Sequence, residues 1–251
     1  MNLRPVAIAG AGAGAVVAAG LAIHSAPSLV ALSSVGRHLS PGLAGVGQPG
    51  HVALTFDDGP DPSSTPEFLG ALDTLGWRAT FFMLGEMARR APGLAAEVVA
   101  AGHEVGVHGD THRSQLRLSP RVVADDIARA RDAVADASGV MPVWFRPPYG
   151  TLSLGGMRGA RRAGLRTVLW TAWGRDWREA ATPESVVADV LDGYLDGGTV
   201  LLHDSDCTSA PDCWRSTLHA LPTLAAELTR RSLRVGPVGE HGISIAERFA
   251  A

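Results

Sequence analysis

The sequence predicts an α/β fold in which short parallel strands alternate with helices around one core. Three observations predict it. Apolar runs rich in β-branched and aromatic residues recur between residues 52 and 202, a helical pattern follows each run, and no interior linker divides the region. At 251 residues and 46% hydrophobic composition, the chain can bury one core of barrel size. We therefore expect a closed or partly closed (β/α) barrel of six or seven units, preceded by an apolar N-terminal segment.

The N-terminal segment differs from the rest of the chain in charge. Residues 5–36 carry no formal charge, and residues 6–23 consist of Ala, Gly, Val, Ile and Leu after a single arginine, Arg4. A cleaved signal peptide has an apolar core of about 7 to 15 residues, whereas about 18 or more can span a bilayer. We expect residues 1–36 to be a signal peptide or a signal anchor, with a buried Ala/Gly helix as the alternative. Residues 37–50 are then a linker and residues 51–251 the folded domain, which is extracytoplasmic and either membrane-anchored or secreted.

Each predicted strand is a short apolar run, and each predicted helix has a start signal. The runs lie at residues 52–56, 80–83, 104–108, 143–145, 167–170 and 199–202. A capping hydroxyl before a proline marks a helix start, because the first helical position needs no N–H. These pairs are Thr65-Pro66, Ser119-Pro120 and Thr182-Pro183. The apolar stripes that follow are Phe68, Leu72 and Leu75, then Val123, Ile127, Ala130 and Val134, then Val187, Val190, Leu191 and Tyr194.

The charged residues exclude several classes of protein. All 22 residues in the Lys and Arg count are arginine, which excludes Schiff-base and pyridoxal enzymes, P-loop nucleotide enzymes, protein kinases and Ser-x-x-Lys acyl enzymes. Residues 51–251 carry 20 arginines and all 25 acidic residues, a formal charge of −5. We therefore expect no nucleic-acid partner. No protein partner is indicated either.

Two adjacent carboxylates follow the first predicted strand. Residues 53–56 run directly into Asp57 and Asp58, and then into Gly59-Pro60. In a (β/α) barrel, the loops after the strands carry the chemistry. Successive side chains of a strand point to opposite sides, so one carboxylate can bind a cation while the other approaches the same place from beside it. The alternative is an Asx turn before the Gly-Pro pair.

Two histidines follow the third predicted strand at a spacing typical of metal ligands. His108 and His112 are four residues apart, which would place both imidazoles on one side of a helical turn. A carboxylate from the first strand completes a two-His-one-carboxylate set that leaves positions open for water and substrate. Such a set is typical of a catalytic metal site, although a histidine pair at this spacing also occurs by chance.

Polar residues follow the later strands as well. Arg146 begins an Arg-Pro-Pro-Tyr-Gly run, in which two prolines stiffen the loop and the guanidinium can grip a carboxylate. Asp176 and Trp177 follow the fifth strand, and the sixth ends in Leu-Leu-His-Asp at residues 201–204. Taken singly, the first run is consistent with a rigid turn and the strand-end histidine with a structural role.

Together these five segments, in this order, resemble the polysaccharide deacetylase family, which is also described as the NodB homology domain and as carbohydrate esterase family four. The motifs are Thr-Phe-Asp-Asp-Gly-Pro from residue 55, His-x-x-x-His from 108, Arg-Pro-Pro-Tyr from 146, Asp-Trp from 176 and Leu-x-His-Asp from 201. The resemblance covers about residues 50–238. It implies a distorted NodB-type (β/α) barrel of about seven units, with residues 51–251 as the catalytic domain.

The resemblance implies that a divalent metal ion is bound beside a base. Asp58, His108 and His112 would be the metal ligands, Asp57 the catalytic base, and Arg146 the residue that orients it. Zinc is the expected ion, with cobalt, manganese and nickel as alternatives, because all of them accept this ligand set.

The resemblance also implies an acid and a substrate pocket. His203 would be the general acid, positioned by Asp176. The backbone N–H of Tyr149 would help to hold the oxyanion. Trp177 and Leu201, together with Tyr149, would contact the substrate and line the pocket for its acetyl methyl group.

Two local features extend or depart from the family pattern. Many members have Ser or Thr after the first ligand histidine, where this chain has Gly109, so we expect Asp110 or Thr111 to support that loop instead. Cys207 and Cys213 are six residues apart. They would form a disulfide across the loop after the general acid in an oxidising compartment, and two separate thiols otherwise.

The function that the resemblance implies is hydrolysis of a linear amide. A metal-dependent hydrolase would remove N-acetyl groups from an N-acetylglucosamine-containing polysaccharide such as peptidoglycan or chitin. Water activated by the ion would attack, with Asp57 as base and His203 as acid to the leaving amine. The alternatives are an O-acetyl xylan esterase, a small-amide hydrolase and a catalytically silent glycan-binding domain. The partner is then an N-acetylated glycan, with membrane contact through an uncleaved N-terminal segment.

Overall fold

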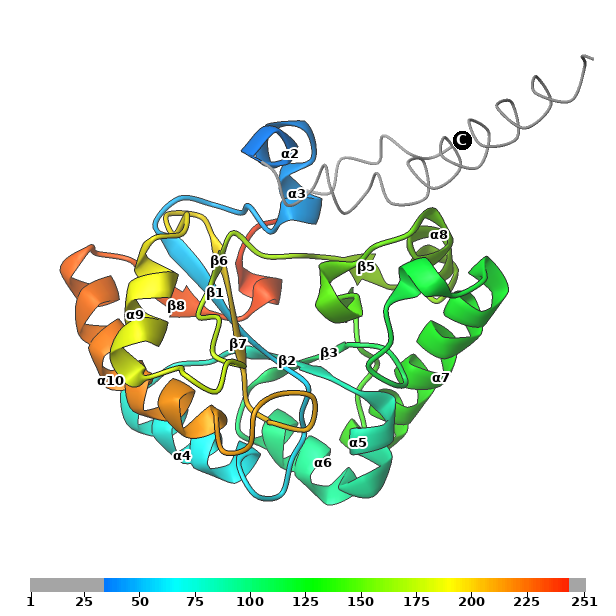
Figure 1. The fold of residues 1–251 in the computed structure, drawn as a ribbon, viewed down its shortest axis with the longest axis horizontal. Coiled ribbons are helices and arrows are strands. Elements are labelled where there is room, and N and C mark those ends of the chain that lie inside the picture. Colours follow the sequence, from blue (N-terminus) through cyan, green and yellow to red (C-terminus); the bar gives the residue numbers. More distant parts are fainter. Residues whose placement is uncertain (1–33, 244–251) are drawn as a thin grey trace, which may run out of the picture.

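Parallel strands form the centre of the molecule, and helices cover the outer side of their sheet (Figure 1). The structure is a computed structural model that describes residues 34–243. The strands are β1 (His51–Asp57), β2 (Thr80–Met83), β3 (Glu104–Val107), β4 (Trp144–Phe145), β5 (Arg166–Thr167), β6 (Ala172–Trp173), β7 (Thr199–His203) and β8 (Arg234–Gly236). They pair in the order β5-β4-β3-β2-β1-β7-β6, with β8 beside β1. The expected distorted α/β barrel is therefore confirmed, as a half-barrel whose edges are β5 and β6.

The helices begin close to the expected positions. They are α4 (Thr65–Leu75), α5 (Gly85–Arg90), α6 (Pro92–Ala100), α7 (Pro120–Ser138), α8 (Leu154–Arg162), α9 (Pro183–Leu191) and α10 (Trp214–Arg230). The caps at Ser119 and Thr182 are confirmed, since each side chain accepts a hydrogen bond from a backbone N–H in the first turn of its helix. The cap expected at Thr65 is wrong by one residue. Thr65 is already helical, and its hydroxyl donates to Asp204 instead.

The main apolar core lies between the sheet and the helices. Phe68 and Leu72 of α4 are fully buried there, and the whole stripe expected for α7 is buried as well. In α9 the stripe is confirmed for Val187 and Val190, but Tyr194 is 44% exposed. The prediction for Tyr194 is wrong because α9 ends at Leu191, three residues before it. Residues three or four apart share one face only within a helix, so the helical spacing does not predict burial beyond Leu191.

The segment expected as a single fifth strand, residues 167–170, crosses the gap between the two sheet edges. It leaves β5, where the Val168 N–H donates to the Phe145 carbonyl at 3.0 Å. It enters β6, where the Thr171 N–H donates to the Thr199 carbonyl at 2.9 Å. The same run of chain is therefore hydrogen-bonded to β4 at one edge of the sheet and to β7 at the other. In a closed barrel the two edge strands, β5 and β6, would instead pair directly with each other.

Residues at the N-terminal border are docked on the domain. All but the last three residues of the expected signal or anchor segment, 1–36, lie outside the described residues. The expected linker, 37–50, contains the second half of α2 (Ser34–Leu39) and all of α3 (Pro41–Ala44). Its backbone is held by the domain, since Thr199 Oγ1 donates to the Gly45 carbonyl at 2.7 Å. Between residues 34 and 243, no helix is long and apolar enough to cross a membrane.

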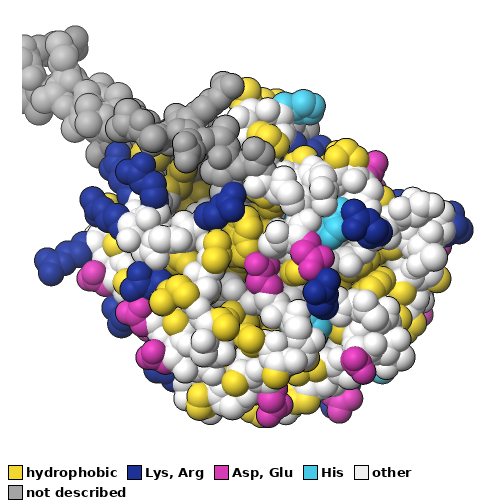
Figure 2. All heavy atoms as spheres, turned by 180° about the vertical axis from the view of Figure 1, so that it is seen from behind, with side chains coloured by type: hydrophobic (Ala, Val, Ile, Leu, Met, Phe, Trp, Pro, Cys, Tyr) yellow, Lys and Arg dark blue, Asp and Glu magenta, His cyan; other side chains and the backbone are white. Residues whose placement is uncertain are grey.

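The surface carries both signs of charge. Figure 2 shows arginine side chains gathering on the side of the molecule that carries α7 and α8. These helices contain Arg121, Arg129, Arg131, Arg158, Arg161 and Arg162. In α7, arginines are paired with acidic residues of the same helix, as Arg131 is with Asp132 and Arg129 with Asp126. Such pairs reduce the positive potential that a nucleic-acid backbone would require.

A buried pair of histidines joins the start of β1 to the chain after β8. The Nδ1 atoms of His51 and His241 are 2.8 Å apart, and both side chains are almost fully buried. His241 Nε2–H donates to the Gly197 carbonyl, so neutral His241 accepts at Nδ1 and His51 donates. Burial lowers the pKa of His241 to about 4, with repulsion from His51 adding to it. Burial and the charge of Arg234 also lower the pKa of His51, against the opposing charge of Glu240.

We predict that this pair makes the fold sensitive to acid. A histidine with pKa about 6.5 in the unfolded chain and about 4 in the folded protein contributes stability above pH 6.5. The contribution is lost as the pH falls toward 4, by up to about 3 kcal/mol. Urea unfolding at several pH values should therefore show a shallower pH dependence for His241→Gln than for the wild type. His219→Gln, on the exposed face of α10, is the control, and parallel curves for all three proteins would contradict the prediction.

Candidate functional site

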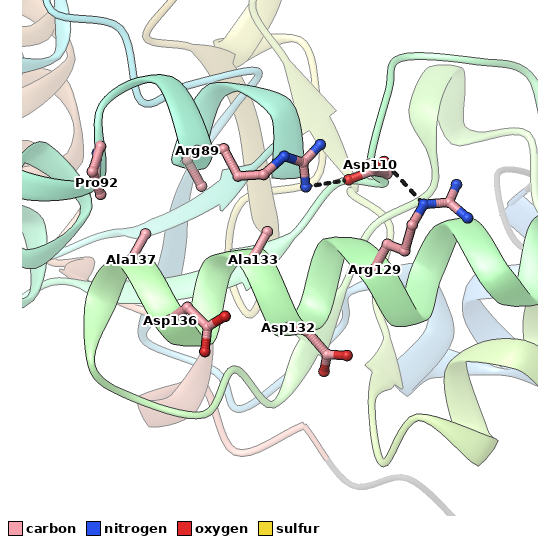
Figure 3. A pocket seen from close by; sticks show the side chains of 9 residues that line it. Arg89, Pro92, Asp110, Arg129, Asp132, Ala133, Asp136 and Ala137 are labelled. Atoms are coloured by element: carbon pink, nitrogen blue, oxygen red, sulfur yellow. Dashed lines mark hydrogen bonds and ion pairs between the residues drawn. The ribbon is translucent and has the colours of Figure 1, made fainter.

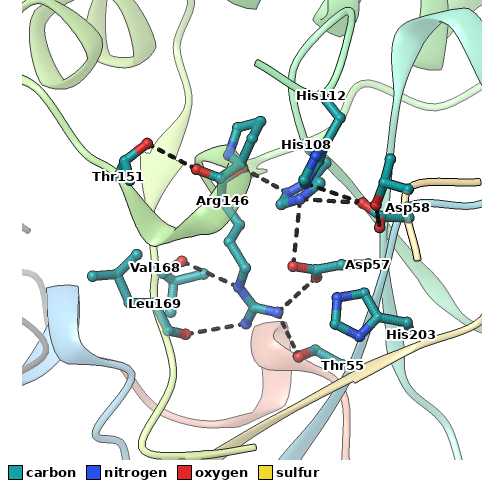
Figure 4. A network of polar contacts seen from close by, with 12 residues as sticks. Thr55, Asp57, Asp58, His108, His112, Arg146, Thr151, Val168, Leu169 and His203 are labelled. Atoms are coloured by element: carbon teal, nitrogen blue, oxygen red, sulfur yellow. Dashed lines mark hydrogen bonds and ion pairs between the residues drawn. The ribbon is translucent and has the colours of Figure 1, made fainter. Parts of the chain in front are cut away.

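Figure 4 shows six of the residues expected at the site together where β1, β3, β4 and β7 end: Asp57, Asp58, His108, His112, Arg146 and His203. The strand register accounts for part of this convergence. Asp57, the last residue of β1, lies opposite His203, the last residue of β7, and opposite Phe82 on its other side. Val107 of β3 lies opposite Phe145 of β4, so His108 and Arg146 follow paired positions. The carboxyl ends of parallel strands thus collect carboxylate, imidazole and guanidinium groups at one end of the half-barrel.

Arg146 is completely buried in the interior of the half-barrel. Its Nη1 donates to Asp57 Oδ1 at 2.8 Å and to Thr55 Oγ1 at 2.7 Å, and Nη2 donates to the Leu169 carbonyl at 3.0 Å. Its guanidinium also lies over the Phe82 ring, 4.2 Å from the centroid. Burial lowers the pKa of Arg146, and the Asp57 carboxylate opposes that effect. One oxygen of Asp57 is thereby held, which leaves Oδ2 directed at the histidine side of the site.

Asp58, His108 and His112 form a group that could hold a metal ion. Asp58 Oδ1 lies 3.4 Å from His108 Nε2 and 3.6 Å from His112 Nε2. These separations suit a tetrahedral ion, whose ligand atoms are about 3.4 Å apart at bond lengths of about 2.1 Å. Asp58 Oδ1 is buried and has no hydrogen-bond partner among the described residues, as expected of an atom that serves a cation.

Two further observations fit the metal site. His108 Nδ1–H donates to the Arg146 carbonyl at 2.9 Å, which leaves the lone pair of Nε2 free for the ion. Burial on its own would raise the pKa of Asp58, but the nearby histidines, His203 first among them, and a hydroxyl donor outweigh it and lower that pKa. The carboxylate is therefore in the ionised form that a metal ligand needs.

The histidine pair is brought together by a loop rather than by the expected helical turn. Residues 108–114 contain no helix, and Gly109 has φ +97°, which strongly favours glycine. A Cβ on Gly109 would also lie 3.2 Å from Asp126 Oδ2. The imidazole centroids of His108 and His112 are nevertheless only 5.3 Å apart. The expected proximity is thus found, by a different backbone path.

Asp110 supports this loop from behind, as one of the two residues expected to do so. Its carboxylate accepts from Arg89 Nη1 at 2.7 Å and from Arg129 Nε at 3.2 Å (Figure 3). Its backbone N–H donates to Asp126 Oδ2 at 3.0 Å. The two arginines also line a surface pocket of about 620 Å³ between α5, α6 and α7. Both arginines are already paired with Asp110. They therefore support the loop that carries His108 and His112, and we do not assign the pocket as the functional site.

His203 and Asp176 form a second carboxylate–imidazole pair. His203 Nδ1–H donates to Asp176 Oδ1 at 2.8 Å, and the His203 backbone N–H donates to Oδ2 at the same distance. Thr217 Oγ1 also donates to Oδ2, at 2.6 Å. Burial alone would lower the pKa of His203, but the charge and hydrogen bond of Asp176, with Asp58 and Asp57, raise it to about 10. The imidazole is therefore held as a cation at neutral pH.

Tyr149 lies in a tight turn beside the histidines. Its backbone has φ +59° and ψ +11°, an unusual conformation for a non-glycine residue. The residue is 61% exposed, and its ring packs 4.3 Å from the imidazole of His112, centroid to centroid. Within residues 34–243, the Tyr149 N–H donates to no acceptor, while the N–H groups of Gly150 and Thr151 are both used in the turn. The turn therefore offers one free amide donor next to the ligand group.

The expected pocket residues lie on the His203 side. The Trp177 ring meets the His203 ring edge to face at 5.7 Å. Leu201 is two residues before His203 on β7 and shares its face of the strand, 4% exposed. The disulfide hypothesis for the following loop is wrong, because Cys207 and Cys213 are both free thiols. Cys207 instead lies with Sγ 3.5 Å from the Asp58 carbonyl, while Cys213 is buried at the start of α10.

Three threonines contact the site residues and were not among the expected ones. Thr55 meets Arg146, Thr217 meets Asp176, and Thr208 donates to Asp58 Oδ2 at 2.5 Å. Thr55 could have been found from the sequence, because it lies two residues before Asp57 on the same face of β1. No pattern marks Thr208 or Thr217, which come from a loop and a helix far along the chain.

Comparisons with known proteins agree with this geometry. Residues 44–168 match the family model described as polysaccharide deacetylase. A peptidoglycan-N-acetylglucosamine deacetylase of Bacillus cereus is 36% identical over 191 residues, covering 75% of this chain and 86% of that protein. A chitooligosaccharide deacetylase of Bradyrhizobium is 35% identical, covering 74% and 88%. A solved family 4 carbohydrate esterase from Streptomyces lividans, in complex with acetate, has a TM-score of 0.67 and 34% identity, covering 74% and 92%.

We predict that the Asp58–His108–His112 group binds one divalent ion per chain. Zinc added to metal-free protein at a hundred times its dissociation constant should raise the free energy of unfolding by about 2.7 kcal/mol. Replacing His112 by Gln should remove most of this increase, whereas His219→Gln should keep it. Thermal unfolding with and without zinc measures both, and equal stabilisation of the two variants would contradict the prediction.

Proposed function

The chain belongs to the polysaccharide deacetylase family, and from that premise we propose that it is a metal-dependent hydrolase that removes N-acetyl groups from an N-acetylglucosamine polymer such as peptidoglycan or chitin. One observation carries the proposal. Two polarised pairs, Asp57 with Arg146 and His203 with Asp176, flank the candidate metal ligands at the ends of β1 and β7. A base and an acid that face the same ligand group are what amide hydrolysis requires.

The candidate metal supplies one part of the chemistry. When bound by Asp58, His108 and His112, a divalent ion polarises the acyl carbonyl and makes water a better acid. The protein side of the site fixes these three ligands. The Arg146 carbonyl holds the imidazole of His108, and the salt bridges of Asp110 hold the loop between the two histidines.

Asp57 is the proposed base. Its Oδ1 is occupied by Arg146, so Oδ2 is the oxygen available to take a proton from the attacking water. Oδ2 lies 3.6 Å from His108 Nε2, which places it beside the ligand group. The guanidinium fixes the carboxylate in orientation, and a general base must lie within reach of the proton that it takes.

His203 is the proposed acid. Its Nδ1–H is committed to Asp176, so proton donation to the leaving nitrogen must come from Nε2. An amine is a poor leaving group until it is protonated, and a histidine held as a cation by a carboxylate provides that proton. The free N–H of Tyr149 would share the negative charge on the carbonyl oxygen, and Leu201 and Trp177 would enclose the acetyl methyl group.

Removal of O-acetyl groups is the second candidate. The solved relative from Streptomyces lividans is named as an esterase and contains acetate. The same base, acid and ligand group would serve an acetate ester, because both reactions pass through a tetrahedral oxyanion.

We predict that acetate release depends on Asp57. Zinc-reconstituted protein should release acetate from peptidoglycan or chitooligosaccharides in preference to acetylxylan. Asp57→Asn should lower kcat by about 10²- to 10⁴-fold and still bind zinc, since general base catalysis contributes that much. Asp73→Asn, on the exposed face of α4, is the matched control. An undiminished rate in Asp57→Asn would refute the assignment, release from acetylxylan alone would favour the esterase, and zinc binding without any release would favour a silent glycan-binding domain.

We predict that Asp176 sets the alkaline limit of activity. Removing its charge in Asp176→Asn lowers the pKa of His203, so the acid form is lost at lower pH. The alkaline limb of the kcat/KM profile should move down by about 1–3 pH units. Thr217→Val deletes a donor to Asp176 but keeps the carboxylate, so its limb should move much less. An alkaline limb that stays in place in Asp176→Asn would show that His203 is not the acid.

A further inference from the structure

We propose that Thr208 is a positioning residue for the metal site, whose hydroxyl selects which oxygen of Asp58 faces the histidines. The inference rests on the proposed function in taking Asp58, His108 and His112 as metal ligands. Thr208 lies outside the five segments that carry the family resemblance. It comes from the loop between β7 and α10, 150 residues after Asp58.

The two oxygens of Asp58 have different surroundings. Oδ2 accepts a hydrogen bond from Thr208 Oγ1 at 2.5 Å. Oδ1 is buried, has no hydrogen-bond partner among the described residues, and lies 3.4 Å and 3.6 Å from the Nε2 atoms of His108 and His112. The carboxylate is therefore arranged to bind a cation through one oxygen only, with the other oxygen satisfied by the hydroxyl.

Without this hydroxyl, the orientation of Asp58 would be poorly determined. The side chain is about 1% exposed, so water cannot easily replace the lost donor. Oδ2 would then be a second buried oxygen without a partner, and rotation of the carboxylate would let either oxygen face the histidines. Such rotation lowers the affinity for a metal ion, because the ligand oxygen must be directed at the place between the two imidazoles.

The loop that carries Thr208 is held against the site at several points. The preceding residue, Cys207, places its thiol 3.5 Å from the Asp58 carbonyl, so both ends of Asp58 contact the loop. Ser205 Oγ accepts from the Cys207 N–H at 3.1 Å and donates to Asp61 Oδ2 at 3.0 Å. Further along, the Ala210 N–H donates to the Trp177 carbonyl at 3.2 Å. Thr208 is thus held in place on both sides, as an effective outer partner of a metal ligand must be.

Zinc affinity of the full chain tests the proposal without reference to catalysis. Affinity is measured by competition with a chromogenic chelator for the wild type, Thr208→Val and Thr208→Ser. Thr208→Val keeps the shape and removes the hydroxyl, and should weaken zinc binding by about 10- to 100-fold, as loss of an outer-shell partner does. Thr208→Ser keeps the hydroxyl and should bind nearly as the wild type does. Thr74→Val, an exposed threonine on α4, is the matched control and should have no effect.

The outcomes separate this inference from the proposed function. Unchanged zinc affinity in Thr208→Val overturns it, and so does an equal loss in Thr208→Ser, because the hydroxyl would then not be the cause. The melting temperature of metal-free Thr208→Val should equal that of the wild type. A lower melting temperature, together with weak zinc binding in both Thr208→Val and Thr208→Ser, would indicate a structural role for Thr208 and would also overturn the inference. If Thr208→Val alone loses affinity while the wild type releases no acetate, the inference holds and the proposed function fails.

Discussion

The buried guanidinium of Arg146 connects the barrel wall to the site, and much of the structure depends on it. It reaches from the end of β4 to Thr55 and Asp57 on the central strand, and to the carbonyls of Val168 and Leu169 in the crossing segment. That segment joins two sheet edges that do not pair directly, so its carbonyls need donors from inside. Breaking a buried pair of this kind costs about 3–5 kcal/mol, because it leaves one charge without compensation. The hydrogen bonds of this one guanidinium thus both stabilise the segment between β5 and β6 and orient Asp57.

Two adjacent carboxylates acquire different chemistry because their surroundings differ. Asp57 ends β1 and shares a face with Thr55, which directs it to Arg146. Asp58 has φ +80° and turns away from the strand toward His108, His112 and Thr208. The Arg146 guanidinium holds one carboxylate and leaves it one free oxygen, while two imidazoles and a hydroxyl surround the other and prepare it for a cation. The same residue type can therefore provide a base and a ligand at consecutive positions.

Strand periodicity and the rule for barrel loops were sufficient to predict the fold class and to place Asp57, His108, Arg146 and His203 at one end of the barrel. Other features depended on backbone details that a residue pattern does not encode. Gly109, at φ +97°, replaces the expected helical turn by a loop, and residues 167–170 are extended without forming one strand. Thr208 and Thr217 were not predictable, because their partners lie 150 and 41 residues away and a lone threonine has no distinguishing pattern.

The absence of lysine has a structural counterpart in these contacts. Arg146 donates to four acceptors that lie around a planar group, and an ammonium offers only three donors from a single atom. Asp110 is gripped by two arginines, Arg89 and Arg129, which approach different oxygens and so fix the plane of the carboxylate (Figure 3). Lysine at any of these three positions would keep the charge but lose the directionality that holds Asp57 and the ligand loop. The site therefore depends on the geometry of the guanidinium as well as on its charge.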